Sequence, residues 1–319
     1  PSVTTAQAQT MSEIQLTGTA SGGSKTGGTL AGGETNGFGE TGGDLTAAPA
    51  STAGPEAAAF DGTYIWVATQ FSDSVTRIRV TDGAVSGTFK VGRRPVALLY
   101  AGSSLWVANL LSNNVMRLSP STGAILATYA VGDGPGGLAY DGTNVWVANR
   151  HSNTVTKLRA STGANLGSFA VGKRPIGVAF AANSVWVANN FSNTVTRLST
   201  AGAVLGTYAV GRGPFGVTGQ GENVWVTNYF GKSVTKLRAA DGSNLGTFQV
   251  GDGAAGIVFD GNSLWVVNNG DSTVMRVSTT GSVITTYTTG KGPFAVAYDG
   301  ARIWVPNFGS NSVSMASVN

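Results

Sequence analysis

The seven tryptophans of the chain follow one another at a nearly constant spacing of 40 or 39 residues. They are Trp66, Trp106, Trp146, Trp186, Trp225, Trp265 and Trp304. A proline keeps the same register as Pro55, Pro95, Pro135, Pro175, Pro214 and Pro293, and Ala254 takes its place in the sixth unit. Two independent markers in one register indicate seven repeats. A repeat of this length must stack on its neighbours to bury a core.

Each unit contains four short apolar runs separated by turn residues. In the fifth unit the runs cover residues 214–218, 223–228, 233–237 and 245–250. Valine, threonine and aromatic residues dominate the runs and favour pleated sheet, while Gly/Asn and Asp-Gly pairs between them favour turns. Four strands in about 40 residues are typical of a propeller blade. We therefore predict an all-β fold, a seven-bladed β-propeller of four-stranded blades.

Two segments follow from this register. The propeller is expected over residues 54–319, with repeats starting near residues 54, 94, 134, 174, 213, 253 and 292. Residues 1–53 form a glycine-rich N-terminal tail whose centre, residues 19–43, has a five-residue periodicity. Such a composition is typical of a linker, with a short strand pattern near residues 11–19 preceding it.

The repeat resembles a known class. Its pattern, VG-x-x-P-x-G-[VL]-A-[YF]-D-G-x-x-[VL]-WVAN-x-x-SN-x-V-[TM]-[RK]-L, resembles YVTN/NHL propeller repeats and is similar to the propeller of virginiamycin B lyases. The resemblance covers residues 54–319 and implies the fold far more than the function. A lyase of that kind would need a catalytic histidine and glutamate with a bound metal ion. This chain has one histidine, His151, and none of its five glutamates recurs in the repeat. We therefore expect no catalysis, no cofactor and no metal.

Composition narrows the function classes. The chain has no cysteine, which excludes a disulfide framework and thiol chemistry. A net charge of +4 is too small to indicate nucleic-acid binding, and no run approaches the length of a membrane span. Charged residues make up only 11%. A start at Pro1 without methionine is read as a processed N-terminus, so we expect an exported protein, extracellular or at the cell surface.

Two recurring side chains have a structural and a functional interpretation. The tryptophans are expected to pack between blades, and the alternative is a ring that stacks on sugars. An asparagine follows the second run in six units, as Asn109, Asn149, Asn189, Asn228, Asn268 and Asn307. It is expected to bond backbone at the turn, and the alternative is a polar ligand-binding ring.

The last unit lacks its fourth strand. It covers residues 293–319 and ends after the third run, which would leave a bare sheet edge. Two tail segments could fill the gap, residues 44–52 and residues 12–17. In the second, Ile14 and Leu16 alternate with Glu13, Gln15 and Thr17. About thirty residues tether it to the propeller, enough to reach roughly 100 Å.

From the tail we predict assembly of copies of the chain. Residues 1–20 are expected to add as a strand to a neighbouring copy, with Ile14 and Leu16 in side-chain pockets, giving a homo-oligomer or filament. Closure of blade seven by the chain's own tail is the alternative. The predicted function is thus a non-catalytic structural or adhesive building block.

Loops on one face of the propeller suggest a second function. They carry basic and aromatic side chains, namely Arg94, Arg150, Lys173, Arg174, Phe191, Arg212, Tyr229, Phe230 and Lys232. Such a face suits an anionic glycan or a protein partner, although ordinary solvated loops look the same in a sequence. A lyase-like enzyme is the third alternative.

Overall fold

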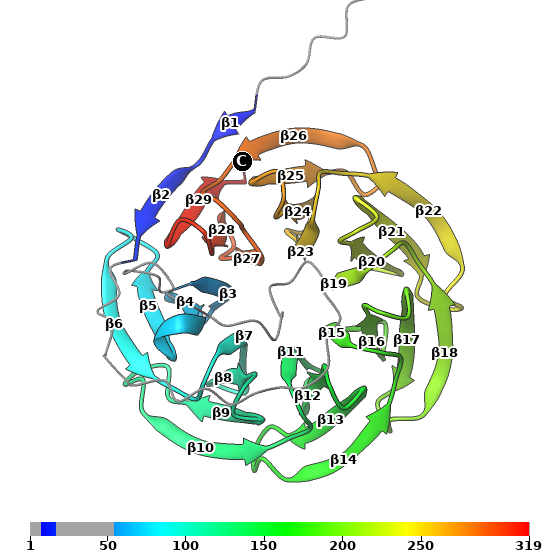
Figure 1. Cartoon of the computed structure of the whole chain (residues 1–319), viewed down its shortest axis with the longest axis horizontal. Coiled ribbons are helices and arrows are strands. Elements are labelled where there is room, and N and C mark those ends of the chain that lie inside the picture. The colour runs from blue at the N-terminus through cyan, green and yellow to red at the C-terminus, as the bar shows by residue number, and fades with distance from the viewer. Residues whose placement is uncertain (1–7, 17–53, 319) are drawn as a thin grey trace, which may run out of the picture.

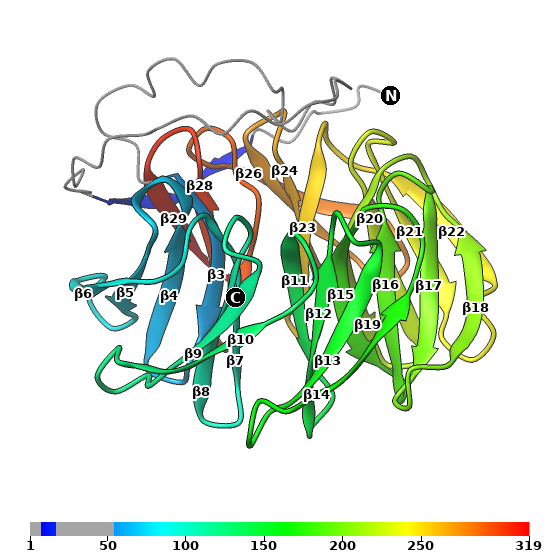
Figure 2. The same ribbon diagram turned by 60° about the horizontal axis from the view of Figure 1, so that its bottom comes forward.

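The computed structural model describes residues 8–16 and 54–318, and they form a seven-bladed β-propeller. Figure 1 views the ring down its axis, with each blade running outward from the centre. Every blade has four antiparallel strands, which are consecutive in the sequence except in the last blade, where the outer strand comes from the N-terminal segment. The N-terminal segment also adds a fifth, parallel strand to blade six. Figure 2 shows the N-terminal strands, in blue, beside the red strands of blade seven. The predicted fold class is confirmed. The described residues contain one short 3-10 turn, η1 (Gln70–Ser72), and no helix long and apolar enough to cross a membrane.

The strands recur in the same order in each blade. The innermost strands are β3 (Pro55–Phe60), β7 (Pro95–Ala101), β11 (Pro135–Tyr140), β15 (Pro175–Ala181), β19 (Pro214–Gln220), β23 (Ala254–Phe259) and β27 (Ala297–Tyr298). The second strands are β4 (Tyr64–Thr69), β8 (Ser104–Asn109), β12 (Asn144–Asn149), β16 (Ser184–Asn189), β20 (Asn223–Asn228), β24 (Leu264–Asn268) and β28 (Arg302–Asn307). The third strands are β5 (Ser74–Arg79), β9 (Asn114–Leu118), β13 (Thr154–Arg159), β17 (Thr194–Ser199), β21 (Ser233–Arg238), β25 (Thr273–Val277) and β29 (Ser312–Ser317). The outer strands are β6 (Val85–Lys90), β10 (Ile125–Ala130), β14 (Asn165–Ala170), β18 (Val204–Ala209), β22 (Asn244–Gln249) and β26 (Val283–Thr288), with β2 (Ser12–Gln15) in blade seven.

Each tryptophan lies between two blades. All seven are fully buried. Trp186 of blade four packs with Val224, Val226 and Leu237 of blade five, and it contacts the ring of Tyr208 on its own outer strand, 5.8 Å between centroids. The packing interpretation is therefore confirmed, because a fully buried ring has no surface left for a sugar.

The cation on the third strand extends this contact. The guanidinium of Arg197 lies 5.5 Å over the Trp186 ring, and Arg197 donates a hydrogen bond of 2.6 Å to the carbonyl of Ala240 in the next blade. On the other side, the outer-strand Tyr208 covers Gly242 in the next blade's turn, where a Cβ would overlap the ring. Cation, indole and phenol thus hold one blade to the next through a single layer.

The inner strands approach closely around the axis. The second residue after the repeat proline position is small in every blade, as Ala57, Ala97, Gly137, Gly177, Gly216, Gly256 and Ala295. A Cβ on Gly177 would overlap the carbonyl oxygen of Phe215 on the neighbouring inner strand. The small side chain recurs because backbone from the next blade occupies that space.

Blade seven is closed within the chain. Strand β2 pairs antiparallel with β29, with Ile14 opposite Val313, and the Leu16 amide donates to the Asn311 carbonyl at 2.8 Å. Figure 1 shows β2 outside β29 and the short β1 (Gln9–Thr10) outside β26, with which β1 pairs in parallel. The structure therefore has the cis closure that the sequence left as the alternative to docking on a neighbour. Thr17, the periodic segment 19–43 and the other closing candidate, residues 44–52, lie outside the described residues.

The tail strand reproduces the contacts of the other outer strands. Leu16 is buried and, together with Ile14, packs against Ile65 and Ile78 of blade one. Ile14 lies over Gly83 in the turn of blade one, where a Cβ would be 2.9 Å from its Cδ1. At the boundaries from blade one to blade six an outer-strand aromatic ring covers the corresponding turn glycine. At the ring junction the aliphatic side chain of Ile14 covers it instead.

The recurring asparagines bond third-strand hydroxyls more than backbone. Asn149 Nδ2 donates to Thr154 Oγ1 at 3.0 Å and to Thr156 Oγ1 at 2.9 Å. Asn268 also accepts from the Gly251 amide at 3.1 Å. The expected backbone bond is thus the minority pattern, because the third strand offers hydroxyls within reach. All six asparagines are fully buried, so a ligand-binding ring is ruled out at this position.

We predict that Trp186→Ala lowers the free energy of unfolding by about 3–5 kcal/mol, because it opens a cavity between blades four and five. Chemical denaturation followed by circular dichroism measures this. Leu205→Ala is the control, since Leu205 is 51% exposed and its loss should change stability by about 0.5 kcal/mol or less. An equal effect of the two substitutions would contradict the assignment of the core.

We also predict that deleting residues 1–20 lowers the free energy of unfolding by about 3–6 kcal/mol, an upper estimate from the apolar side chains that β2 and Met11 bury. A synthetic peptide of residues 9–17 added in excess should bind the truncated chain and restore the denaturation midpoint. Truncation without loss of stability would show that β2 contributes little to ring closure.

Candidate functional site

One face of the propeller is built by two sets of loops, which we call the loop face. It comprises the loops that enter each inner strand and the loops that join second to third strands. Within blade four the Lys173 amide donates to Ser192 Oγ at 2.8 Å, and the Arg174 amide donates to Asn153 Oδ1 of the preceding blade at 2.8 Å. The same bond from the Gly54 amide to Asn311 Oδ1, at 3.0 Å, closes the ring. The loops therefore form a continuous, backbone-anchored surface.

The predicted binding residues all belong to these loops, but their exposure differs. Lys173, Arg212 and Lys232 are exposed. Lys232 Nζ lies 2.9 Å from Asp252 Oδ2, and the hydrogen bond to this carboxylate raises the pKa of Lys232. Arg150 and Arg174, in contrast, are buried, with 9% and 7% of their surface exposed. Two of the predicted basic residues are therefore packed into the protein and not presented to solvent.

Aromatic rings form a row on part of this face. The row runs from Phe71 of blade one through Phe308 and Phe294 of blade seven to Phe215, Tyr229 and Phe230 of blade five, with centroid separations of 5.2 to 6.2 Å. Blade six has the small Ala254 and Ala255 at the matching positions, which leaves room for Phe215 and Phe294 to meet. These two rings were not among the predicted binding residues, because each directly follows the repeat proline and so lies past the loop that carries those residues.

Tyr229 is held in this row by a hydrogen bond and by a ring contact. Its hydroxyl donates to Asn269 Oδ1 at 2.8 Å, and its ring packs on Phe215. Burial, aided by the nearby Asp252 carboxylate, raises the pKa of Tyr229. The phenol therefore stays protonated near neutral pH and acts here as a hydrogen-bond donor.

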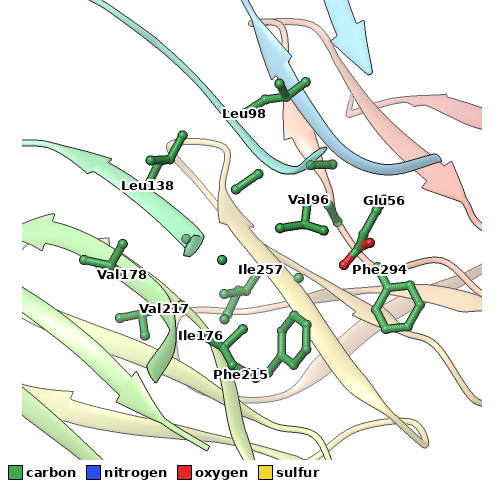
Figure 3. Close-up of a pocket in the computed structure, with 18 of the residues that line it drawn as sticks. Glu56, Val96, Leu98, Leu138, Ile176, Val178, Phe215, Val217, Ile257 and Phe294 are labelled. Carbon is green, nitrogen blue, oxygen red and sulfur yellow. The ribbon is translucent and has the colours of Figure 1, made fainter. Parts of the chain in front are cut away.

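The inner strands surround a cavity of about 190 Å³ on the propeller axis. Figure 3 shows its apolar lining, which includes Leu98, Leu138, Val178, Val217 and Ile257 from successive blades. Among the described residues that line it, two are charged, Glu56 from β3 and Arg150 from the loop after β12. The cavity is thus an apolar space with one carboxylate and one guanidinium in its wall.

Arg150 reaches the cavity because the inner strand of blade three has a glycine, and hence no side chain, at the position facing it. Gly136 occupies the position where blades one, four and five carry Glu56, Ile176 and Phe215. A Cβ at Gly136 would overlap the Nε of Arg150. The glycine therefore makes space for the guanidinium, a relation that the sequence pattern alone did not reveal.

His151 lies on the loop face beside a carboxylate. Its Nδ1 is 3.7 Å from Asp133 Oδ2, and both side chains are exposed. Asp133 is 18 residues earlier in the chain and comes close to His151 through the loop contact. Within residues 8–16 and 54–318, no group of three or more histidine, cysteine, aspartate or glutamate side chains could hold a metal ion.

Several carboxylates have shifted pKa values for a structural reason. Asp141, Asp260 and Asp299 accept hydrogen bonds of 2.7 to 2.8 Å from the indole nitrogens of the tryptophans in their own blades. Partial burial opposes ionisation, but the indole and backbone hydrogen bonds outweigh it and lower the pKa of all three carboxyls. These acids are engaged in holding the blade core.

Comparison with known proteins supports the fold but does not indicate a specific function. No protein-family model matches the sequence, and a search of curated proteins finds no relative. Among solved structures, the chain is similar to Kuenenia stuttgartiensis hydrazine synthase (19% identity, TM-score 0.77, 84% of this chain and 96% of that chain). It is also similar to a streptogramin B lyase (16%, 0.74, 83% and 94%) and to virginiamycin B lyase from Staphylococcus aureus (16%, 0.73, 83% and 96%). At such identities the likeness is one of fold, and at that level the expected similarity to virginiamycin B lyase propellers is confirmed.

We predict that replacing Asp141, Asp260 and Asp299 together by asparagine flattens the acid limb of the stability profile. Their pKa values are lowered on folding, so the stability they contribute is present above their unfolded pKa of about 3.9 and is lost as the pH falls below it. The stability difference between wild type and variant should be largest at pH 7 and shrink towards pH 2.5, measured by urea midpoints. Glu222→Gln, an exposed change, is the control. If the stability difference between wild type and variant did not change with pH, ionisation of these carboxyls would not be linked to folding stability.

Proposed function

We propose that the protein is a non-catalytic, exported building block that self-assembles by exchanging strand β2 between copies. One observation carries the proposal. Blade seven takes its outer strand from a segment that precedes the propeller by 38 residues, counted from Leu16 to Gly54. A closing element on so long a tether can be supplied by another copy as well as by the chain itself.

Exchange preserves every contact that closes the ring. The four registered pairs between β2 and β29 and the burial of Met11 and Leu16 would be the same whether the strand comes from its own chain or a neighbour. Domain swapping of this kind is a low-cost route to assembly, because the interface already exists in the monomer. Passed head to tail, it propagates into a filament instead of closing as a dimer.

Two quantities determine whether β2 pairs within its own chain or with another copy: the length of chain between β2 and the propeller, and the protein concentration. Fully extended, 38 residues span about 125 Å, so the tether does not confine β2 to its own propeller. A tethered strand has a high effective concentration at its own groove, which favours cis closure in dilute solution. Assembly is therefore expected to grow with protein concentration.

The proposal that the protein is non-catalytic rests on the contacts that its described carboxylates make. The described carboxylates with lowered pKa values are bonded to indole nitrogens or to turn backbone and arginine. Export to the cell surface is proposed from the cysteine-free, weakly charged composition. Recognition of an anionic glycan or a protein on the loop face stays a separate prediction.

The test uses the absence of cysteine from the chain. Glu13 on β2 is opposite Ser314 on β29, a spacing that a disulfide can bridge. Copies carrying only Glu13→Cys are mixed with copies carrying only Ser314→Cys, concentrated, and oxidised. We expect covalent dimers on a non-reducing gel, because the disulfide can form only when the strand of one copy pairs with another.

The control mixes Glu13→Cys with Ser86→Cys, which places the second thiol on the outer strand of blade one, outside the register of β2. This mixture should give only background dimers. The doubly substituted chain should form an internal disulfide at low concentration. If the registered mixture stays monomeric up to millimolar concentration while the double variant closes internally, β2 acts only in cis and the assembly proposal fails.

A further inference from the structure

The third strand of each blade supplies one aliphatic side chain to the core that it shares with the preceding blade. In six blades this side chain is large, fully buried and three residues after the valine of that strand, as Ile78, Leu118, Leu158, Leu198, Leu237 and Val277. Blade seven has the half-buried Ala316 at this position. An alanine where the fold uses a leucine leaves a cavity unless another group fills it. Blade seven therefore lacks one large side chain of its own.

The N-terminal segment supplies the group that blade seven lacks. At the other six junctions, the described core combines a tryptophan and a third-strand valine of one blade with two second-strand residues and the third-strand aliphatic of the next. Between blades six and seven the fifth member is Met11, and the first four are Trp265, Val274, Ile303 and Val305. Ala316 packs against this same cluster. Met11 thus belongs to the core in place of a third-strand leucine.

Met11 lies where the tail passes from one blade to the other. Its amide donates to the Thr288 carbonyl of blade six at 3.3 Å, and the next residue, Ser12, is opposite Met315 of blade seven. Only 7% of Met11 is exposed. A methionine side chain is long, unbranched and flexible, so it can fill an irregular space that it enters from the rim of a blade. We call this space, beside Ala316 in the core of blades six and seven, the Met11 site.

The Met11 site also fixes the register of the tail. Met11 packs on the side of blade seven that faces blade six, whereas Ile14 and Leu16 pack on the side that faces blade one. Side chains alternate between the two faces of a strand, so a slip of one residue along β29 would turn all three away from their cores. One face of the blade thus selects a single side chain and the other face selects two.

We propose that the Met11 site is the specificity determinant by which blade seven recognises its closing strand. The strand it accepts is an extended segment with a long, unbranched apolar side chain three residues before the first of two alternating aliphatic residues. The partner that carries this pattern is the N-terminal segment of a second copy of the chain, in the order Met11, Ile14, Leu16. The inference rests on the proposed exchange of β2 and names what the acceptor blade recognises.

The first experiment measures urea midpoints of the full chain and does not depend on exchange. Met11→Ala should lower the midpoint, because it empties part of the core. Ala316→Leu should lower it as well, because the added side chain overpacks the site that Met11 fills. The chain with both substitutions should have a midpoint above that of either single variant, since the leucine then has the place it has in other blades. Gln15→Ala, an exposed change on β2, is the control and should leave the midpoint unchanged.

The second experiment tests selection between copies with the cysteine pair used for strand exchange. Two donors carry Glu13→Cys, one of them together with Met11→Ala, and they compete at equal concentration for an acceptor that carries Ser314→Cys. A short tag on one donor separates the two products on a gel. We expect the donor that keeps Met11 to give at least about tenfold more dimer, the ratio that a loss of about 1.4 kcal/mol produces. On an acceptor that also carries Ala316→Leu, the Met11→Ala donor should give the larger yield.

Three outcomes would overturn the inference. The first is a doubly substituted chain that is less stable than both single variants, which would mean that Met11 and residue 316 do not share one space. The second is a midpoint raised by Ala316→Leu alone, because the space beside Ala316 would then be empty in the wild type. The third is an equal dimer yield from the two donors. Absence of dimers from every donor would contradict exchange and with it the second copy as partner, whereas the midpoints would still decide the role of the Met11 site within the chain.

Discussion

The propeller depends on a layer of indole, phenyl and cationic side chains that is repeated between blades. Each tryptophan is fully buried at the boundary with the next blade, and an outer-strand aromatic ring lies against it in the first six blades. A four-stranded sheet of this size cannot bury both faces alone, so its stability comes from the neighbours on each side. The low charge of the chain is consistent with this arrangement, because most strand surface faces another blade.

Closing the ring requires the same contact between the last blade and the first, where the chain ends. Six blades take all four strands from consecutive sequence, whereas blade seven must obtain its last strand from the other end of the chain. Strand β2 meets the requirement with Ile14 and Leu16 instead of an aromatic ring, and Gly54 is bonded to Asn311 across the same junction. At this junction the ring is held by elements distant in sequence, and the proposed exchange of β2 between copies would use the same contacts.

The repeat also provides an internal reference for function. Positions that the fold requires have the same character in every blade, as the tryptophans and the small inner-strand residues do. Positions that differ between blades, such as Glu56, Gly136, Phe215 and Arg174, are concentrated at the axis and on the loop face. Because the scaffold does not require these residues, their chemistry is free to serve binding. The separation explains how a propeller with such regular blades can still have one asymmetric cavity.

The blade number, the strand order and the burial of the tryptophans could be predicted from the sequence alone, because these follow from local patterns repeated seven times in one register. It also identified β2 as a strand and blade seven as incomplete. The segment that fills that blade is visible only in the folded chain, since loop-closure entropy grows slowly with length and does not select between near and distant strands. The cavity with Glu56 and Arg150 and the row through Phe215 and Phe294 were likewise invisible in the repeat. They arise from side chains of different blades that converge on the axis, and convergence across 40-residue intervals is a property of the closed ring, not of any one repeat.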